Sequence, residues 1–106
     1  MLAQSIFDVQ ARLCRAMGHA TRLEIVHILR EGPKRVSDLA QILDLPQPTV
    51  SRHIAVLRDA GILAHQRGQD GLFYQITNPK ITGVCDLMRE VLSEQYVQQS
   101  QLIDQL

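Results

Sequence analysis

The sequence predicts a small, mostly α-helical domain that contains one β-hairpin. The chain has 106 residues, about the size of a single domain, so we treat residues 1–106 as one unit. Apolar residues make up 45% of the chain and charged residues 21%, which is ordinary for a folded globular protein. Apolar residues recur at helical spacing in four successive segments, then alternate as in strands, then return to helical spacing. The expected order is therefore α-α-α-α-β-β-α.

The first two helices are predicted from their apolar stripes and their stop signals. The first covers residues 2–17 and ends at Gly18. The second follows Thr21, which we expect to cap it, and stops before Gly32-Pro33. The stripe of the first helix consists of Leu2, Ile6, Val9, Leu13 and Met17.

The next two helices are separated by a short break. A helix from Val36 to Leu43 is followed by Asp44-Leu45-Pro46 and then by a helix from Gln47 to Ala60, which Gly61 closes as a left-handed cap. A short helix, a three-residue break and a second helix with a polar face form a helix-turn-helix, here residues 36–60. The stripe expected to face the core is Val50, Ile54 and Leu57.

The alternating segments predict a two-stranded wing directly after this motif. Residues 62–67 and 72–77 alternate like strands, and Gly68-Gln69-Asp70-Gly71 supplies the turn, so the wing is residues 62–77. A last helix is expected over 80–105. Its apolar stripe is Val84, Leu87, Met88, Val91 and Leu92. The fold class is thus a winged helix-turn-helix.

The outward face of the fourth helix suits the major groove of DNA. Arg52 has the donors for a guanine edge, Gln47 for an adenine edge, and Ser51 for a base or a phosphate; each good bidentate contact is worth about 1–3 kcal/mol of discrimination. The wing tip suits the minor groove or the phosphate backbone. Periodicity alone also allows an ordinary solvated face. The predicted DNA contacts are Gln47, Thr49, Ser51, Arg52, His53, Arg67 and Gln69.

The distribution of charge agrees with a DNA-facing centre, although the net charge is zero. Residues 30–67 hold six Lys or Arg against four Asp or Glu, whereas residues 68–106 hold two against five. A mildly basic middle attracts phosphates and an acidic end avoids them. Because the net charge is zero, a second hypothesis stays open: a winged-helix interaction module that does not bind DNA.

Residues 17–77 resemble the ArsR/SmtB family of bacterial winged-helix repressors. The resemblance rests on Thr21-Arg22-Leu23 in the second helix, Thr49-Val50-Ser51-Arg52-His53-Ile54 in the recognition segment, and an Arg-Gly start and a Tyr in the wing. It implies a homodimer built from the helices at 2–17 and 80–105, which binds a palindromic double-stranded DNA operator. One departure is Pro46, where the family usually has a Ser that caps the recognition helix.

Two residues that match the family pattern, His53 and Arg22, have roles that the resemblance does not fix. His53 matches the family's His, and its angle lies between the core stripe and the groove, so a structural role and a base contact are both open. Arg22 matches the family's Thr-Arg, and we expect it to form an ion pair with an acidic residue of a neighbouring helix rather than to contact DNA.

The family releases DNA when an inducer is captured, and the cysteines are the candidate sensors. The segment 35–38 lacks the family's Cys-x-Cys, and the last helix has no histidine, so no metal site and no cofactor are expected. Cys14 and Cys85 lie at the borders of the first and last stripes, positions expected to be half-exposed.

The cysteine pair predicts a small-molecule inducer. Arg15 and Arg89 lie where they would lower a thiol pKa. The family includes repressors in which cysteines of an early and the last helix join through a disulfide or polysulfide bridge. An oxidant or a reactive sulfur species is therefore the predicted inducer. Arsenite or another thiophilic metalloid, and inert buried cysteines, remain open alternatives.

Other function classes find little support. The sequence has no Gly-rich phosphate loop and no nucleophile motif, so an enzyme is not expected. It also has no apolar run of the roughly 18 residues that span a membrane and no signal-peptide pattern, which predicts a cytoplasmic protein without a membrane partner.

Overall fold

The computed structural model describes residues 4–97 and shows five helices and one antiparallel hairpin in the predicted order. The elements are α1 (Ile6–Met17), α2 (Ala20–Leu29), α3 (Val36–Leu43), α4 (Gln47–Asp59), β1 (Leu63–Gly68), β2 (Gly71–Ile76) and α5 (Lys80–Gln95). None of the helices in this part of the chain is long and apolar enough to cross a membrane.

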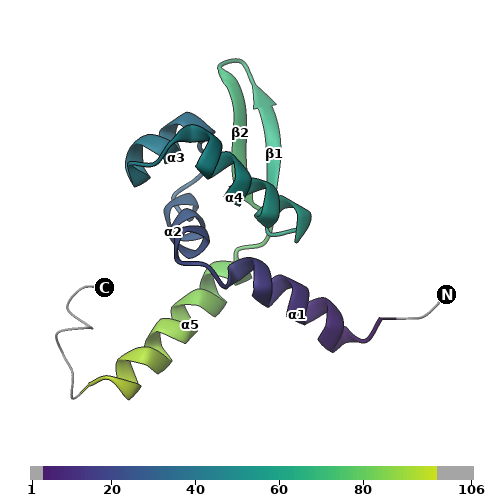
Figure 1. Ribbon diagram of the computed structural model, residues 1–106, viewed down its shortest axis with the longest axis vertical. Coiled ribbons are helices and arrows are strands. Elements are labelled where there is room, and N and C mark those ends of the chain that lie inside the picture. Colours follow the sequence, from purple (N-terminus) through teal and green to yellow (C-terminus); the bar gives the residue numbers. More distant parts are fainter. Residues whose placement is uncertain (1–3, 98–106) are drawn as a thin grey trace.

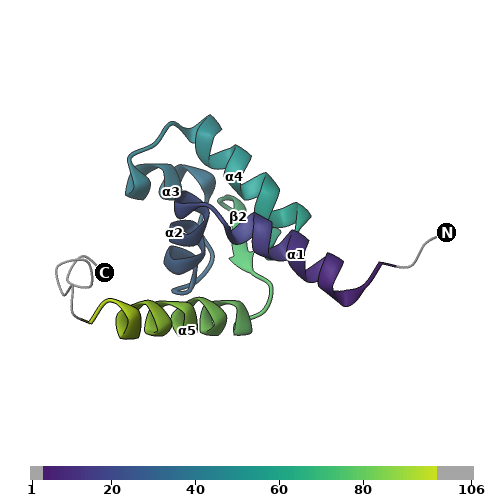
Figure 2. The ribbon, with the colours of Figure 1, turned by 60° about the horizontal axis from the view of Figure 1, so that its bottom comes forward.

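Three helices and the hairpin form the body, and two helices project from it. In Figure 1 the hairpin extends upward beside α3 and α4, while α1 and α5 leave the opposite end in different directions. Figure 2 shows α4 and α5 on opposite sides of the body, with α2 and α3 between them. The fully buried side chains are Ile25, Val26, Leu39, Val50, Ile54, Leu57 and Ile62.

Helix α1 begins later than predicted because Ser5 caps it. The Ser5 hydroxyl accepts from the backbone N–H of Asp8 at 3.0 Å, and the Asp8 carboxylate accepts from the N–H of Ser5 at 3.2 Å. This reciprocal pair is a capping box, which satisfies two donors that the helix start would leave free. The predicted start at residue 2 is therefore wrong for residues 4 and 5, and residues 1–3 lie outside the described part. Gly18 ends the helix as predicted.

Helix α2 is capped by His19 and not by Thr21. The Nδ1 atom of His19 accepts from the backbone N–H of Thr21 at 3.1 Å, and Thr21 already lies inside the helix. The prediction for Thr21 was wrong because an imidazole nitrogen with a free lone pair can cap a helix as a hydroxyl oxygen does.

The helix-turn-helix matches its predicted bounds closely. Asp44 ends α3 in the left-handed conformation, with φ of 54°. Pro46 precedes α4 and offers no side-chain cap; its carbonyl accepts from the N–H groups of Thr49 and Val50. Pro48 has no N–H, so the first turn contains one donor fewer that needs a partner. Gly61 (φ 79°) follows α4 as predicted.

The hairpin lies one residue later in the first strand, and one residue earlier in the second, than predicted. Gly68 pairs with Gly71, so the turn itself is only Gln69-Asp70. The hairpin is also tied to the body, because the backbones of Lys34 and Tyr74 exchange two hydrogen bonds of 3.0 and 2.8 Å. This third short pairing fixes the direction in which the wing leaves the body.

Helix α5 is shorter than predicted. It ends at Gln95, and the N–H of Tyr96 donates to the Leu92 carbonyl as the final turn closes. The expected continuation to residue 105 is wrong at 96 and 97, and residues 98–106 lie outside the described part. An ion pair of 2.7 Å between Arg30 of the α2 C-terminus and Asp86 attaches the start of α5 to the body.

Candidate nucleic-acid interface

Helix α4 separates an apolar face from a polar face, as predicted. Val50 and Leu57 are completely buried and Ile54 is 2% exposed. On the other side Gln47, Ser51 and Arg52 are exposed, and Thr49 at the flank is half-buried. The predicted donors therefore point to solvent, while the same helix is held rigidly by the core.

The polar face has the dimensions and the chemistry that the major groove requires. A helix of 13 residues is about 20 Å long, and with its side chains about 10–12 Å across, which fits a major groove about 12 Å wide. Arg52 donates to the Thr49 hydroxyl at 3.3 Å, which holds the guanidinium near the first turn of the helix. In residues 4–97 the ion pairs are Arg30–Asp86, Arg35–Asp38 and Arg89–Asp86. The charges of Arg52 and Arg67 are therefore not balanced by a carboxylate of this part of the chain and can attract an anionic partner.

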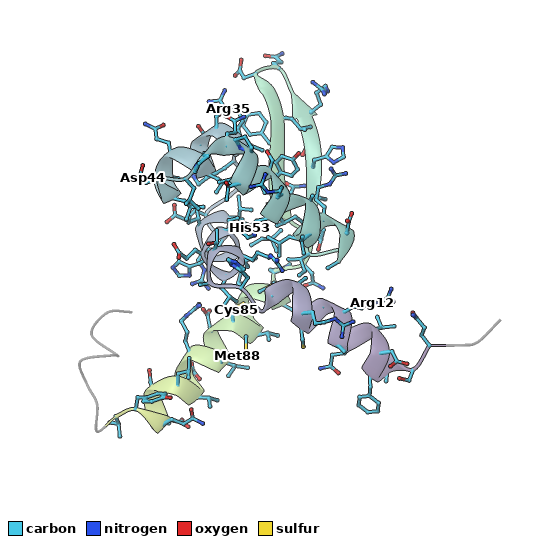
Figure 3. All side chains as sticks on the ribbon, in the orientation of Figure 1. Arg12, Arg35, Asp44, His53, Cys85 and Met88 are labelled. Atoms are coloured by element: carbon cyan, nitrogen blue, oxygen red, sulfur yellow. The ribbon has the colours of Figure 1, made fainter. Side chains whose placement is uncertain are left out.

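His53 points away from this face and toward the body. Its Nδ1 accepts from Nε of Arg22 at 3.2 Å, and its ring centre lies 4.5 Å from that of His19. Figure 3 shows His53 on the side of α4 that approaches α2. Burial lowers the pKa of His53, and the positive charges of His19, Arg22 and Arg52 lower it further. The ring is therefore neutral at pH 7, and its contact is internal.

Arg22 has partners different from the predicted ones. No acidic residue among 4–97 forms an ion pair with it. Instead, its guanidinium donates to His53 of α4 and to the carbonyls of Arg15 and Ala16 at the end of α1, at 3.4 and 3.2 Å. The expected ion pair is thus wrong. The sequence signal for the real contact was present in the Thr-Arg and Ser-Arg-His motifs, but neither motif indicates that the two meet.

The wing presents its two predicted contact residues at its exposed end. Arg67 and Gln69 are both exposed. Arg35 is not among the residues predicted for this region; it donates to the Asp70 carbonyl at 3.3 Å and lies 5.7 Å over the Phe73 ring. It also pairs with Asp38, whose pKa its hydrogen bonds lower. Arg35 therefore anchors the hairpin tip to the start of α3, and its charge is partly neutralised.

The two projecting helices carry large apolar side chains in solvent. The exposed fractions on α5 range from 43% for Leu92 to 61% for Leu87, and on α1 they reach 76% for Phe7. Monomeric proteins rarely leave such contiguous apolar faces uncovered. The exposed apolar residues of these two helices are Ile6, Phe7, Val9, Val84, Leu87, Met88, Val91 and Leu92.

The two cysteines differ in their surroundings. Cys14 on α1 is exposed, whereas Cys85 in the second turn of α5 is only 6% exposed, so the prediction of a half-exposed border position is wrong for Cys85. Figure 3 places Cys85 where α5 meets the body. Burial raises the pKa of the Cys85 thiol despite the nearby Arg89 and Arg30. Within residues 4–97 no three His, Cys, Asp or Glu side chains cluster as metal ligands.

The helix-turn-helix, the hairpin after it and the flanking helices define a winged helix-turn-helix protein. A sequence profile described as "Bacterial regulatory protein, arsR family" matches residues 19–64. The chain is 35% identical to the transcriptional repressor PagR of Bacillus anthracis over 82 residues, which span 76% of this chain and 82% of PagR. It is 32% identical to the biofilm growth-associated repressor of Xylella fastidiosa over 85 residues, which span 80% and 75% of the two chains. This protein belongs to the ArsR family.

Solved structures agree with this assignment. The repressor BigR from Xylella fastidiosa matches with a TM-score of 0.71 and 31% identity, covering 79% of this chain and 86% of BigR. PagR matches with a TM-score of 0.68 and 35% identity, covering 77% and 94%. A homodimeric winged helix-turn-helix DNA-binding domain from Mycobacterium bovis shares the fold, with a TM-score of 0.76 and 24% identity over 89% and 92% of the two chains.

Proposed function

We propose that this protein is a transcriptional repressor that binds a palindromic DNA operator as a homodimer. The observation that carries the proposal is the division of α4, whose apolar side is 0–2% exposed while Gln47, Ser51 and Arg52 face solvent. A rigid helix with a donor-rich outer face is the element that reads base edges in a major groove. The relatives PagR and the biofilm growth-associated repressor are both named as repressors.

The exposed faces of α1 and α5 support a dimer. Burying one leucine side chain stabilises an interface by about 1.5–3 kcal/mol, and eight large apolar residues are available on these helices. A two-fold axis pairs the same patch on both copies, so one patch suffices for both subunits. Two recognition helices then meet half-sites about 34 Å apart, one turn of B-form DNA.

The test is selection of duplexes from a random library, followed by affinity measurements at several salt concentrations. We expect enrichment of a palindrome and an affinity that falls steeply as salt rises, because phosphate contacts release counterions. Arg52→Ala should lower the affinity for the selected site about tenfold or more and leave non-specific binding nearly unchanged. The matched control is Lys80→Ala, which removes an exposed cation at the start of α5, at the opposite end of the body from the wing.

The same selection decides between DNA binding and a protein-interaction module. A module that binds only proteins would enrich no duplex, and its Arg52→Ala variant would behave like the parent. Either result would overturn the proposal. Both measurements report on the exposed face of α4, and neither depends on the stability of the fold.

We further propose that Cys14 and Cys85 form a switch that responds to an oxidant or a reactive sulfur species. Support comes from their positions on α1 and α5, the two helices whose apolar faces are unburied, so a covalent link there would move the dimer interface. Exposed Cys14 is the first thiol to react: a peroxide oxidises it to a sulfenic acid and is itself reduced to water. The Cys85 thiol then displaces a second water to form the disulfide.

The switch is tested by operator affinity before and after hydrogen peroxide or polysulfide treatment. We expect the treated wild type to lose at least tenfold in affinity, and the Cys14→Ser and Cys85→Ser variants to keep theirs. A non-reducing gel shows whether the link joins two chains, which would double the 12.0 kDa mass. Release by arsenite alone would indicate a metalloid sensor, and full affinity after every treatment would indicate inert cysteines; both results contradict the proposed switch.

A further inference from the structure

Arg22 connects three helices through one guanidinium group. Its Nε donates to Nδ1 of His53 on α4, and its Nη1 donates to the carbonyls of Arg15 and Ala16 in the last turn of α1. Carbonyls in the last turn of a helix have spare acceptor capacity, and the Arg15 carbonyl also accepts from the N–H of Gly18 at 3.2 Å. A cation there adds a second donor and interacts favourably with the helix dipole. The recognition helix and the projecting helix α1 are thus joined through a single side chain of α2.

The contact requires one protonation state of His53. Nδ1 accepts a hydrogen bond only when it carries no proton, so the ring is neutral with its proton on Nε2. The groups facing His53 are His19 and Arg22 from α2 and its N-cap, and Arg52 on α4 itself. All of them are positive or can become so. A proton on Nδ1 would remove the acceptor and place a third or fourth positive charge in the cluster.

We infer that Arg22 and His53 are positioning residues that set the angle between the recognition helix α4 and the dimerisation helix α1. This inference rests on the proposed repressor function. In a symmetric dimer, α1 is fixed to the partner and α4 is fixed to the groove. A change at the Arg22–His53 contact therefore alters the separation of the two recognition helices in both subunits at once. It leaves the DNA-contacting side chains themselves unchanged.

Two substitutions at His53 separate positioning from direct DNA contact. Asparagine places its amide oxygen close to where Nδ1 lies, so His53→Asn keeps an acceptor for Arg22 but lacks the reach of Nε2. Glutamine places its amide nitrogen close to Nε2, so His53→Gln keeps the outer donor but loses the acceptor next to the backbone. If His53 positions α4, the Asn variant should bind the selected operator within about threefold of wild type, and the Gln variant about tenfold more weakly. A base contact predicts the reverse order.

The pH dependence of operator affinity is a second measurement. It should respond to His53 only if the contact with Arg22 controls DNA binding. Protonation of His53 removes the acceptor, so the wild-type operator affinity should fall relative to His53→Asn as the pH is lowered through the depressed pKa of His53. The amide of asparagine does not titrate, so the ratio of the two affinities isolates the part of the pH response that depends on this imidazole. We expect the ratio to change at least fivefold once His53 is protonated.

Arg22→Lys provides the second variant. Lysine keeps the charge but cannot hold the flat, forked geometry that reaches His53 and two carbonyls together. It should lower operator affinity about tenfold while sedimentation still shows a dimer and circular dichroism shows a folded chain.

The outcomes distinguish failure of the inference from failure of the proposed function. If wild type enriches no duplex, the repressor proposal fails before any variant is tested. If wild type binds its operator but His53→Gln binds as well as His53→Asn, or Arg22→Lys binds like wild type, the positioning role is wrong and DNA binding stands. A ratio that stays constant while the NMR signals of the His53 imidazole show that it becomes protonated would also overturn the inference.

Discussion

Helices α4 and α5 have the same kind of apolar stripe but opposite surroundings. On α4 the three stripe residues are 0–2% exposed, whereas on α5 Val84, Leu87 and Met88 are 46–61% exposed. Both stripes follow helical periodicity, so the pattern predicts a face without saying what covers it. The difference shows that the apolar face of α4 is covered within one chain, while that of α5 is left exposed, as the proposed dimer requires.

The reason lies in what surrounds each helix. α4 packs against α1, α2, α3 and the hairpin, which together cover its apolar side. α5 approaches the body only near its beginning, where Cys85 is buried and Asp86 pairs with Arg30, and then extends away (Figure 1). A helix that leaves the body cannot bury its later turns without a partner. In the proposed dimer, DNA recognition and dimerisation are therefore carried by separate helices.

Leu57→Ala tests the buried apolar face of α4 and has the largest expected effect on stability. Leu57 is completely buried, so its truncation removes apolar contacts and leaves a cavity, at a cost of about 3 kcal/mol in the free energy of unfolding. Urea unfolding at several protein concentrations measures it. The matched control, Leu87→Ala, removes the same atoms from an exposed site. Its effect should shrink with dilution, because it acts through the dimer and both proteins become monomeric at low concentration. Equal, concentration-independent losses would contradict the comparison.

Leu87→Glu tests the exposed apolar face of α5. A carboxylate in the apolar face of α5 would have to be desolvated in the dimer, so dissociation should increase about 100-fold while the helix content of the chain stays the same. Sedimentation velocity measures the monomer fraction, and operator affinity should fall in parallel. Glu90→Gln, at an exposed site outside the stripe, is the control. A dimer that tolerates Leu87→Glu would place the interface elsewhere.

The local parts of the fold were predictable from the sequence because short-range signals determine them. The break at Asp44-Leu45-Pro46 and the glycine after α4 set the helix-turn-helix within one residue. The Gly-Gln-Asp-Gly turn set the ends of both hairpin strands to within one residue. Ser5 with Asp8 three residues later was also readable as a capping box, and the prediction of a start at residue 2 overlooked it.

The parts that failed depend on residues far apart in the chain. Arg22 meets His53, 31 positions away, and an arginine can pair with an acid, an imidazole or a carbonyl equally well by type. The burial of Cys85 depends on how α5 approaches the body, which its own stripe does not specify. Of the candidate site, the outward donors of α4 followed from periodicity, whereas the inward turn of His53 required the packed structure.

Ser5→Ala tests whether the start of α1, which projects from the body, is ordered by its capping box. The start of α1 has few core contacts, since Ile6 and Phe7 are 70% and 76% exposed, so the capping box supplies much of its order. Its loss should cost about 1 kcal/mol at the helix start. Hydrogen exchange at the Val9 amide, which donates to the Ser5 carbonyl, should become several-fold faster. Ser5→Thr keeps the acceptor and should exchange like wild type; if both variants exchange alike, the cap is not what orders this turn.

Asp86→Asn tests the connection between the two regions, and its effect should be the smallest. Hydrogen bonds from Arg30 and Arg89 hold the pKa of Asp86 below its ordinary value. A carboxylate with a lowered folded-state pKa contributes stability above its unfolded pKa and loses it as the pH falls through the folded value. The wild type should therefore have a slightly higher Tm than Asp86→Asn at pH 7, and the two melting curves should converge once the pH has fallen below the lowered pKa of Asp86. Because the pair is partly exposed, 1 M salt should reduce the difference. A difference that persists in acid would mean that the substitution itself perturbs the packing of α5 and that the ion pairs do not hold this helix to the body.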